Sequence, residues 1–228
     1  MARQVERLDA ERVRARLAEV HERIASTGRD PGDIEILAAV KYVPVEAMGA
    51  LAEAGITVVG ENTAQALIAK QERWGDRFTW DFIGHLQSRK TKDVLPRVRL
   101  IHSVESDSVV ERIERLAERP ARVLLEVNAA GEESKNGVPP AEVDAFVEKA
   151  SRGDKVVFGG LMTMPPFTER PEGARPHFAR LRELRDRLQA EWGGRHDFAE
   201  LSMGTTQDYE VAVEEGATIV RLGSVLYA

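Results

Sequence analysis

The sequence lacks cysteine, long apolar runs and an excess of basic residues. Without cysteine, disulfide bonds and thiolate metal sites are excluded, which fits a reducing cytoplasm. No apolar run approaches the roughly 18 residues of a membrane span, and the charged residues 1–11 do not resemble a secretory signal peptide. The formal charge of −6 argues against nucleic acid, whose phosphates favour a basic surface. We therefore expect a cytoplasmic protein that binds neither membranes nor nucleic acid.

Two ligand-binding patterns are also missing. The five histidines show no metal-ligand spacing such as His-x-x-x-His, so no metal site is expected. No Gly-x-Gly-x-x-Gly follows the first predicted strand, which disfavours a dinucleotide-binding sheet. The apolar fraction of 43% is nevertheless enough for a sizeable core.

Apolar periodicity predicts an amphipathic helix over residues 3–26 and then eight buried strands that alternate with helices. The strands are predicted at 34–41, 57–60, 78–84, 100–104, 122–127, 156–162, 198–203 and 218–223, and the intervening helices at 45–54, 63–74, 88–95, 109–117, 141–151, 176–192 and 207–215. Ser108 with Glu111 predicts a capping box at the start of the helix after the fourth strand.

This alternation implies a parallel sheet, and eight units match a single (β/α)₈ barrel of the TIM type. An open doubly wound sheet is the alternative. We expect one domain over residues 1–228. The helix within residues 1–28 should pack on the barrel beside the first and eighth strands, because little chain remains for an eighth outer helix.

Lys41 closes the apolar run 34–40, three residues before Pro44. An amine at the carboxyl end of a buried strand lies at the rim of an apolar core, where desolvation favours the neutral, nucleophilic form. The ordinary alternative is a lysine that only extends into solvent from a strand end. In barrels of this kind, active sites lie at the carboxyl ends of the strands.

The last two predicted strands end in groups suited to a phosphate. Leu201-Ser202-Met203-Gly204 is followed by Thr205 and Thr206, and Arg221-Leu222 by Gly223 and Ser224. Hydroxyls and glycine amides are what a phosphate dianion needs, although each residue singly is also common in turns. Barrel closure would bring Lys41 and Arg221 to one pocket. A lysine beside an arginine and a phosphate cradle suggests pyridoxal 5′-phosphate (PLP) held as a Schiff base.

Several motifs occur in an order that is specific as a set. They are Val40-Lys41, Gly60-Glu61-Asn62, Phe82-Ile83-Gly84-His85-Leu86-Gln87, Ile101-His102-Ser103-Val104, Val127-Asn128, Gly160-Leu161-Met162-Thr163-Met164, Leu201-Ser202-Met203-Gly204 and Arg221-Leu222-Gly223-Ser224. This set resembles the PLP homeostasis proteins, the YggS/PROSC family, which are similar to the barrel domain of alanine racemase standing alone.

The resemblance implies that Lys41 carries the Schiff base and that Arg221 faces the pyridine nitrogen. It implies further that Asn62 lines the cofactor, and that the phosphate is bound by three residues near the ends of the last two strands: Ser202, Gly223 and Ser224. The sequence departs from the family pattern at Tyr42, Thr63, Asp81, Arg89 and Thr205-Thr206.

We expect a carrier or buffer of PLP that acts in intracellular PLP homeostasis and releases it by transimination to amino acids or to acceptor enzymes. An arginine at the pyridine nitrogen stays protonated and makes the ring a poor carbanion stabiliser, so we expect no turnover. The alternatives are a fold-type III PLP enzyme, such as an amino-acid racemase with Tyr42 or His85 as base, and a Schiff-base aldolase without PLP. A monomer is expected, and the roles of four polar residues stay open: His85, His102, Glu133 and Lys135.

Overall fold

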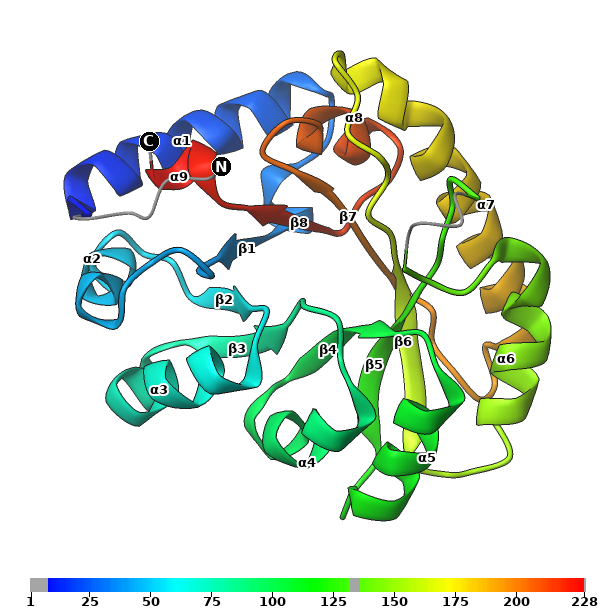
Figure 1. Cartoon of the computed structure of the whole chain (residues 1–228). Helices are drawn as coiled ribbons and strands as arrows, with labels where there is room; N and C mark the ends of the chain where they lie inside the picture. Colours follow the sequence, from blue (N-terminus) through cyan, green and yellow to red (C-terminus); the bar gives the residue numbers. More distant parts are fainter. Residues whose placement is uncertain (1–7, 132–135, 228) are drawn as a thin grey trace.

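The computed structural model describes residues 8–131 and 136–227, and its strands close into a parallel barrel (Figure 1). The strands are β1 (Glu35–Ala39), β2 (Val58–Glu61), β3 (Thr79–Phe82), β4 (Leu100–Val104), β5 (Ala121–Glu126), β6 (Val156–Met162), β7 (Glu200–Thr205) and β8 (Ile219–Leu222). They follow one another in chain order, and β8 pairs with β1. The predicted (β/α)₈ barrel is confirmed, and the open sheet is excluded.

The outer ring consists of helices that follow the strands (Figure 1). They are α2 (Met48–Glu53), α3 (Ala64–Trp74), α4 (Thr91–Val94), α5 (Asp107–Leu116), α6 (Val143–Ala150), α7 (Arg175–Trp192) and α8 (Tyr209–Glu214). Single 3₁₀ turns accompany them at Pro31–Asp33, Val45–Ala47, Gly75–Arg77, Ser88–Lys90, Leu95–Arg97, Pro140–Glu142 and Pro171–Ala174.

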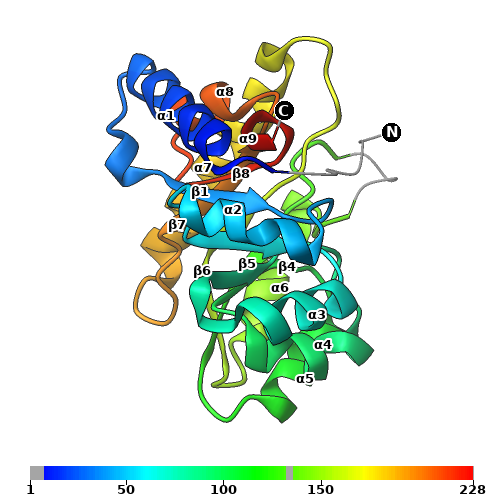
Figure 2. The same cartoon turned by 90° about the vertical axis from the view of Figure 1, so that its left-hand side faces the viewer.

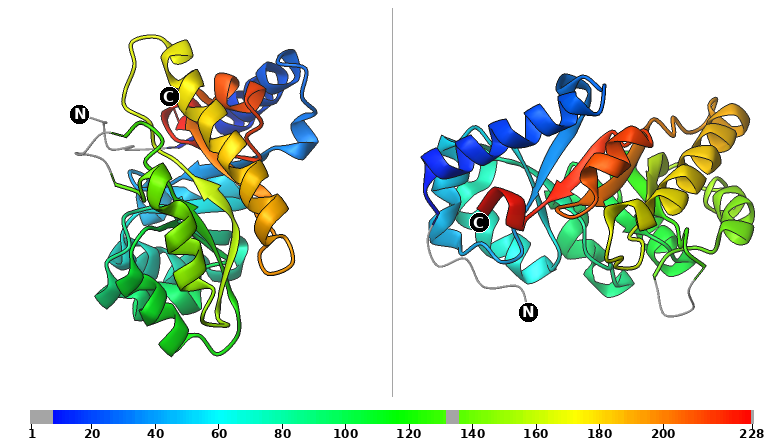
Figure 3. Two further views of the ribbon diagram at one scale, coloured as in Figure 1. Left: turned by 90° about the vertical axis from the view of Figure 1, so that its right-hand side faces the viewer. Right: turned by 90° about the horizontal axis from the view of Figure 1, so that it is seen from above.

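The amino-terminal helix α1 (Ala10–Ser26) lies in the outer ring against α2, α8 and the short α9 (Ser224–Tyr227), as Figures 2 and 3 show. The side chain of Asp9 caps its start by accepting from the amide of Arg12. Its apolar face buries Val13, Val20 and Ile24. The helix therefore covers the part of the ring next to the β8–β1 pair, which the four residues of α9 alone would leave open.

The barrel interior combines an apolar cluster with buried polar side chains. A cluster separate from the main core contains Leu37, Val58, Leu100, Leu124, Met162 and Ile219. Side chains two positions apart on a strand share a face, so the next interior layer contains His102, Glu126 and Arg221, all buried. The sequence thus places ionisable groups at the mouth where such barrels carry their sites.

Two local predictions were wrong. Helix α5 begins at Asp107 with Ser106 as its N-cap, so Ser108 and Glu111 form no capping box. Strand β1 ends at Ala39 rather than Lys41, because the chain turns there and the amide of Val43 donates to the carbonyl of Val40. Within residues 8–131 and 136–227, no helix has the length and hydropathy that a membrane span needs.

Candidate functional site

Closure of the barrel sets Lys41 and Arg221 at the same mouth. Leu37 of β1 pairs with Arg221 of β8, and Lys41 follows four residues later, past the carboxyl end of β1. Lys41 is exposed, and its ammonium nitrogen lies 5.2 Å from the centroid of the Tyr42 ring. The prediction that an apolar rim desolvates this lysine was therefore wrong, whereas its position at the carboxyl-terminal mouth agrees with the prediction.

The two terminal nitrogens of the Arg221 guanidinium are both held by acceptors inside the barrel. One guanidinium nitrogen donates to both the carbonyl and the hydroxyl of Ser202, each at 2.6 Å. The other donates to the carbonyl of Thr163 at 2.8 Å and to the sulfur of Met164 at 2.9 Å. Burial lowers the pKa of Arg221 to about 10, so the guanidinium is still protonated at neutral pH.

Behind Arg221, a line of polar side chains crosses the barrel towards the opposite mouth. His102 lies between Ser202, whose Oγ is 2.9 Å from Nδ1, and Asp81, whose Oδ2 is 3.1 Å from Nε2. Asp81 in turn accepts from Arg99, which also binds Glu35. The buried carboxylate of Asp81 is thus paired with Arg99 on one side and His102 on the other.

The hydrogen-bond pattern assigns the protons along this line. Burial lowers the pKa of His102, so its ring is neutral. A carboxylate only accepts, so the proton of His102 lies on Nε2 towards Asp81. Nδ1 then accepts from the hydroxyl of Ser202, whose oxygen accepts from Arg221. The only O–H of Ser202 is thus donated within the barrel.

Glu126 is a buried carboxyl in the same layer that the sequence analysis did not identify. It ends β5 and is 6% exposed. Burial, and then the charge of Glu105, raise its pKa to about 7, while the nearby Arg221 opposes this shift. The sequence signal was a glutamate that closes the apolar run 123–125, two residues beyond the interior Leu124.

Two backbone amides converge on the hydroxyl of Thr206, in the loop after β7. Gly223 and Val225 donate to its Oγ1 at 3.3 and 3.4 Å. The turn that presents Thr206 is built by Asp208, which accepts from the amide of Thr205 at 2.7 Å. Gly204 has a φ of +90°, and a β-carbon there would lie 2.6 Å from that of Ala212. The exposed Ser224 lies between the two donating residues.

The predicted phosphate-binding residues are therefore divided. Gly223 and Ser224 belong to the loop around Thr206, whereas Ser202 lies inside the barrel and contacts Arg221 and His102. Thr206 was noted in the sequence as a hydroxyl after strand seven but was not chosen. It lies beyond the strand, so its side chain is free of the in-and-out alternation that commits Ser202 to the interior.

Asn62 follows β2 and is exposed at the same mouth as Lys41. Its amide donates to the carboxylate of Glu61 at 2.8 Å. Its carbonyl lies directly against Gly84, where a β-carbon would approach that oxygen to 2.1 Å. Gly84 thus allows the loops after β2 and β3 to pack backbone to backbone.

The two histidines whose roles the sequence left open, His85 and His102, lie in different parts of the structure. His102 belongs to the interior line, whereas His85 is half exposed and its Nδ1 lies 2.6 Å from Glu105. Glu105 also accepts from the amide of Gly137 and so joins the loops after β3 and β5. Glu133 and Lys135 lie outside the described residues.

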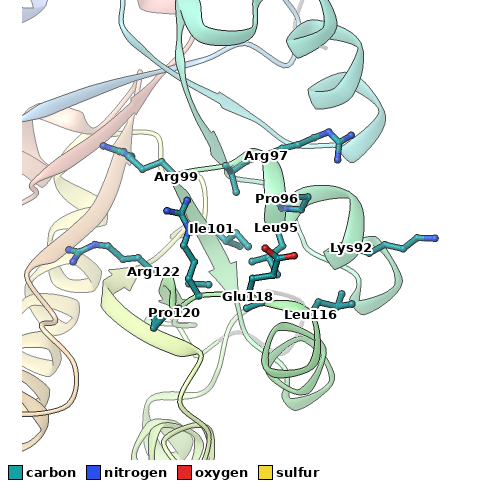
Figure 4. Close-up of a pocket in the computed structure, with 14 residues that line it drawn as sticks. Lys92, Leu95, Pro96, Arg97, Arg99, Ile101, Leu116, Glu118, Pro120 and Arg122 are labelled. Carbon is teal, nitrogen blue, oxygen red and sulfur yellow. The ribbon is translucent and has the colours of Figure 1, made fainter.

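A cavity of about 1060 Å³ opens at the other mouth, between the amino-terminal ends of β4 and β5 (Figure 4). Arg99 and Arg122 line it, and both are occupied by carboxylates: Arg99 by Glu35 and Asp81, Arg122 by Asp197 and Glu200. It lies away from Lys41 and Thr206, so we do not assign it to the candidate site.

Comparison with known proteins identifies the family. The profile of the alanine racemase N-terminal domain matches residues 8–228. A pyridoxal phosphate homeostasis protein of Aquifex aeolicus (strain VF5) is 41% identical over 220 residues, covering 93% of this chain and 96% of that protein. The chain belongs to the family of pyridoxal phosphate homeostasis proteins. A family member from Pseudomonas aeruginosa is 35% identical over 224 residues, with 96% and 94% covered.

Solved structures agree with this family assignment. PipY of Synechococcus elongatus PCC7942, with PLP bound, superimposes with a TM-score of 0.84 at 31% identity, covering 95% of this chain and all of that one. An alanine racemase of Clostridium difficile 630 gives a TM-score of 0.73 at 16% identity and covers 97% of this chain but 57% of the racemase. The racemase shares the fold. The resemblance found in the sequence is confirmed.

Glu126 makes stability depend on pH. Its pKa is raised from 4.5 to about 7, so its contribution to stability is fully present below about pH 4.5 and is lost as the pH rises through 7. We expect Glu126→Gln to remove this loss, which amounts to at most about 3 kcal/mol between pH 5 and pH 8. Urea unfolding at both pH values measures it, with the exposed Glu118→Gln as control. An unchanged pH dependence in Glu126→Gln would contradict the assignment.

Gly84→Ala tests the close contact with Asn62. The added β-carbon would lie 2.1 Å from a backbone oxygen, so the two loops must separate. We expect a loss of about 1–3 kcal/mol in the free energy of unfolding. Gly194→Ala is the matched control, because nothing lies within 4 Å of a β-carbon built there. Equal stability of the two variants in urea unfolding would show that the contact relaxes freely.

Proposed function

We propose that the protein holds PLP at the carboxyl-terminal mouth of the barrel, as a Schiff base with Lys41, and passes it on in intracellular PLP homeostasis. One observation carries this proposal. The β1–β8 pair puts Lys41, Arg221 and the loop of Thr206 and Gly223 at one mouth. The PLP bound to PipY and the names of the relatives support it.

The residues present fit each part of PLP. The exposed amine of Lys41 is available to the aldehyde, and the exposed side chain of Asn62 lines the same mouth. For the phosphate, we propose the hydroxyl of Thr206 with the amides of Gly223 and Val225, joined by the hydroxyl of Ser224. These amides now donate to the hydroxyl oxygen of Thr206, and a phosphate oxygen would replace it as their acceptor.

In this proposal Ser202 supports Arg221 rather than binding the phosphate, because its hydroxyl already accepts from Arg221 and donates to His102. Arg221 would face the pyridine nitrogen. The two residues would thus act on the ring end of the ligand, and the Thr206 loop on its anionic end.

Bound PLP supplies an aldehyde that condenses with amines and a pyridine ring that withdraws electrons strongly only when its nitrogen is protonated. The guanidinium of Arg221 has donors only and keeps its own proton, so it cannot hold a proton on that nitrogen. This supports a role in holding PLP over one in carbanion chemistry. Exchange of the α-proton of added amino acids with deuterated water would contradict it and favour a racemase-like enzyme.

Capture and release need no other reactant than an amine. Lys41 would hold PLP through its amine, since a primary amine and an aldehyde condense with loss of one water molecule. An incoming amine would take the place of Lys41, which would leave as the free amine. We propose amino acids or the lysine of an acceptor enzyme as that amine, and a cytoplasmic monomer as the working form, since every proposed contact comes from one chain.

Reduction with borohydride tests the covalent link. We expect the protein incubated with PLP to absorb as an imine, to lose this band on reduction, and to gain the pyridoxyl mass on the peptide that contains Lys41. Lys41→Ala should abolish the labelling, whereas Lys149→Ala, at an exposed surface ion pair, should not. Label distributed over many lysines, or retained in Lys41→Ala, would rule out the proposed site.

Thr206→Val tests the phosphate contact. Losing a hydrogen bond to a charged group should weaken binding of pyridoxine 5′-phosphate, which has no aldehyde, by about tenfold or more. Ser202→Ala should weaken it less, because Ser202 acts through Arg221. Isothermal titration calorimetry compares the two variants. A larger effect of Ser202→Ala than of Thr206→Val would instead support the sequence prediction that Ser202 binds the phosphate.

A further inference from the structure

A buried ion pair lies directly behind Lys41 and Asn62, the first of which the proposed function places at the aldehyde of PLP and the second at the same mouth. Lys70 of α3 is 3% exposed and Glu61, the last residue of β2, is fully buried. Their side chains form a close salt bridge. Neither residue was identified in the sequence as a site residue, since Lys70 reads there as one more charged residue of an amphipathic helix.

The pair is connected to the backbone on both sides. The ammonium of Lys70 donates to the carbonyl of Val40 at 2.6 Å, next to Lys41 in the chain. The second carboxylate oxygen of Glu61 accepts from the amide of Asn62 at 2.8 Å. One continuous chain of contacts therefore joins the backbone at Lys41 to the backbone at Asn62.

A second side chain holds the same end of β1. The hydroxyl of Tyr227 in α9 donates to the carbonyl of Ala39 at 3.2 Å. Tyr227 also lies close enough to Glu61 for that charge to raise its pKa, in addition to the larger effect of burial. The two carbonyls before Lys41 are thus fixed by side chains from two helices that are far apart in the sequence.

Stability alone does not explain this arrangement. Two buried charges lose their hydration, and replacing such a pair by apolar residues of similar size is often neutral or stabilising. What the apolar replacement cannot supply is the donor for Val40 and the acceptor for Asn62. Small displacements of reacting groups lower the probability of bond formation steeply.

We propose that the ion pair of Glu61 and Lys70, with Tyr227, is a positioning device that fixes Lys41 and Asn62 relative to each other for reaction with an aldehyde. This rests on the proposed function. Lys70 and Glu61 do not touch the ligand. They hold the backbone from which the two contacting side chains extend.

The double variant Glu61→Leu with Lys70→Met tests the proposal without leaving one buried charge unpaired. We expect it to fold, to bind pyridoxine 5′-phosphate within about threefold of the parent protein, and to form the imine with PLP with an equilibrium constant at least about tenfold lower. Calorimetry measures the first constant and imine absorbance the second. The matched control, Asp107→Leu with Lys149→Met, removes an exposed pair between α5 and α6 and should change neither constant.

Tyr227→Phe provides an independent test, because it removes one hydroxyl and keeps the ring. We expect the same separation of effects, with a smaller loss of imine formation. Unchanged imine formation in a folded double variant or in Tyr227→Phe overturns the positioning role. So does an equal loss for pyridoxine 5′-phosphate and PLP. Failure of the proposed function itself is distinguishable, because the parent protein would then show no Lys41-dependent imine.

Discussion

The pairing of β8 with β1 is the constraint on which the candidate site depends. It aligns Leu37 with Arg221 and Ala38 with Leu222, so segments about 180 residues apart become neighbours. Because every strand is parallel, the carboxyl ends all meet at one mouth. The period of two along each strand then decides which side chains enter the barrel: Leu37 and Ile219 belong to its apolar cluster, and Arg221 lies two residues beyond Ile219 on the same face of β8. An open sheet with the same strands would leave Lys41 and Arg221 at opposite edges.

The buried charge of Arg221 determines the hydrogen bonds that Ser202 and His102 make. Buried guanidinium donors need acceptors, and Arg221 takes them from two carbonyls, a hydroxyl and a sulfur. The hydroxyl of Ser202 therefore accepts from Arg221, and it donates to the neutral ring of His102. We therefore propose the phosphate site one step outside, in the loops after β7 and β8, where the amides of Gly223 and Val225 meet the hydroxyl of Thr206. The polar interior and the proposed anion site are thus consecutive along β7 and the loop that follows it, with Ser202 in the first and Thr206 in the second.

Periodicity and turn residues were sufficient to predict all eight strands, the barrel and the mouth at which Lys41 and Arg221 lie, because these depend on burial patterns along the chain. Sequence could not distinguish Ser202 from Thr206, since both are hydroxyls near a strand end and only the strand's register separates them. Glu61 and Lys70 were missed for another reason. They matter because Lys70 donates to the carbonyl of Val40 and Glu61 accepts from the amide of Asn62. No local sequence pattern connects a helix lysine to a carbonyl 30 positions away.

Two lysines lie near the end of β1, Lys41 and Lys70, and their surroundings differ. Lys70 is buried, paired with Glu61 and bonded to the carbonyl of Val40, so its nitrogen is already occupied by these two partners. Lys41 is exposed, and among residues 8–131 and 136–227 no carboxylate forms an ion pair with it. A nucleophile must have room for an incoming carbonyl carbon. Of the two lysines, only the exposed Lys41 has that room, and in our proposal Lys70 holds the backbone from which Lys41 extends.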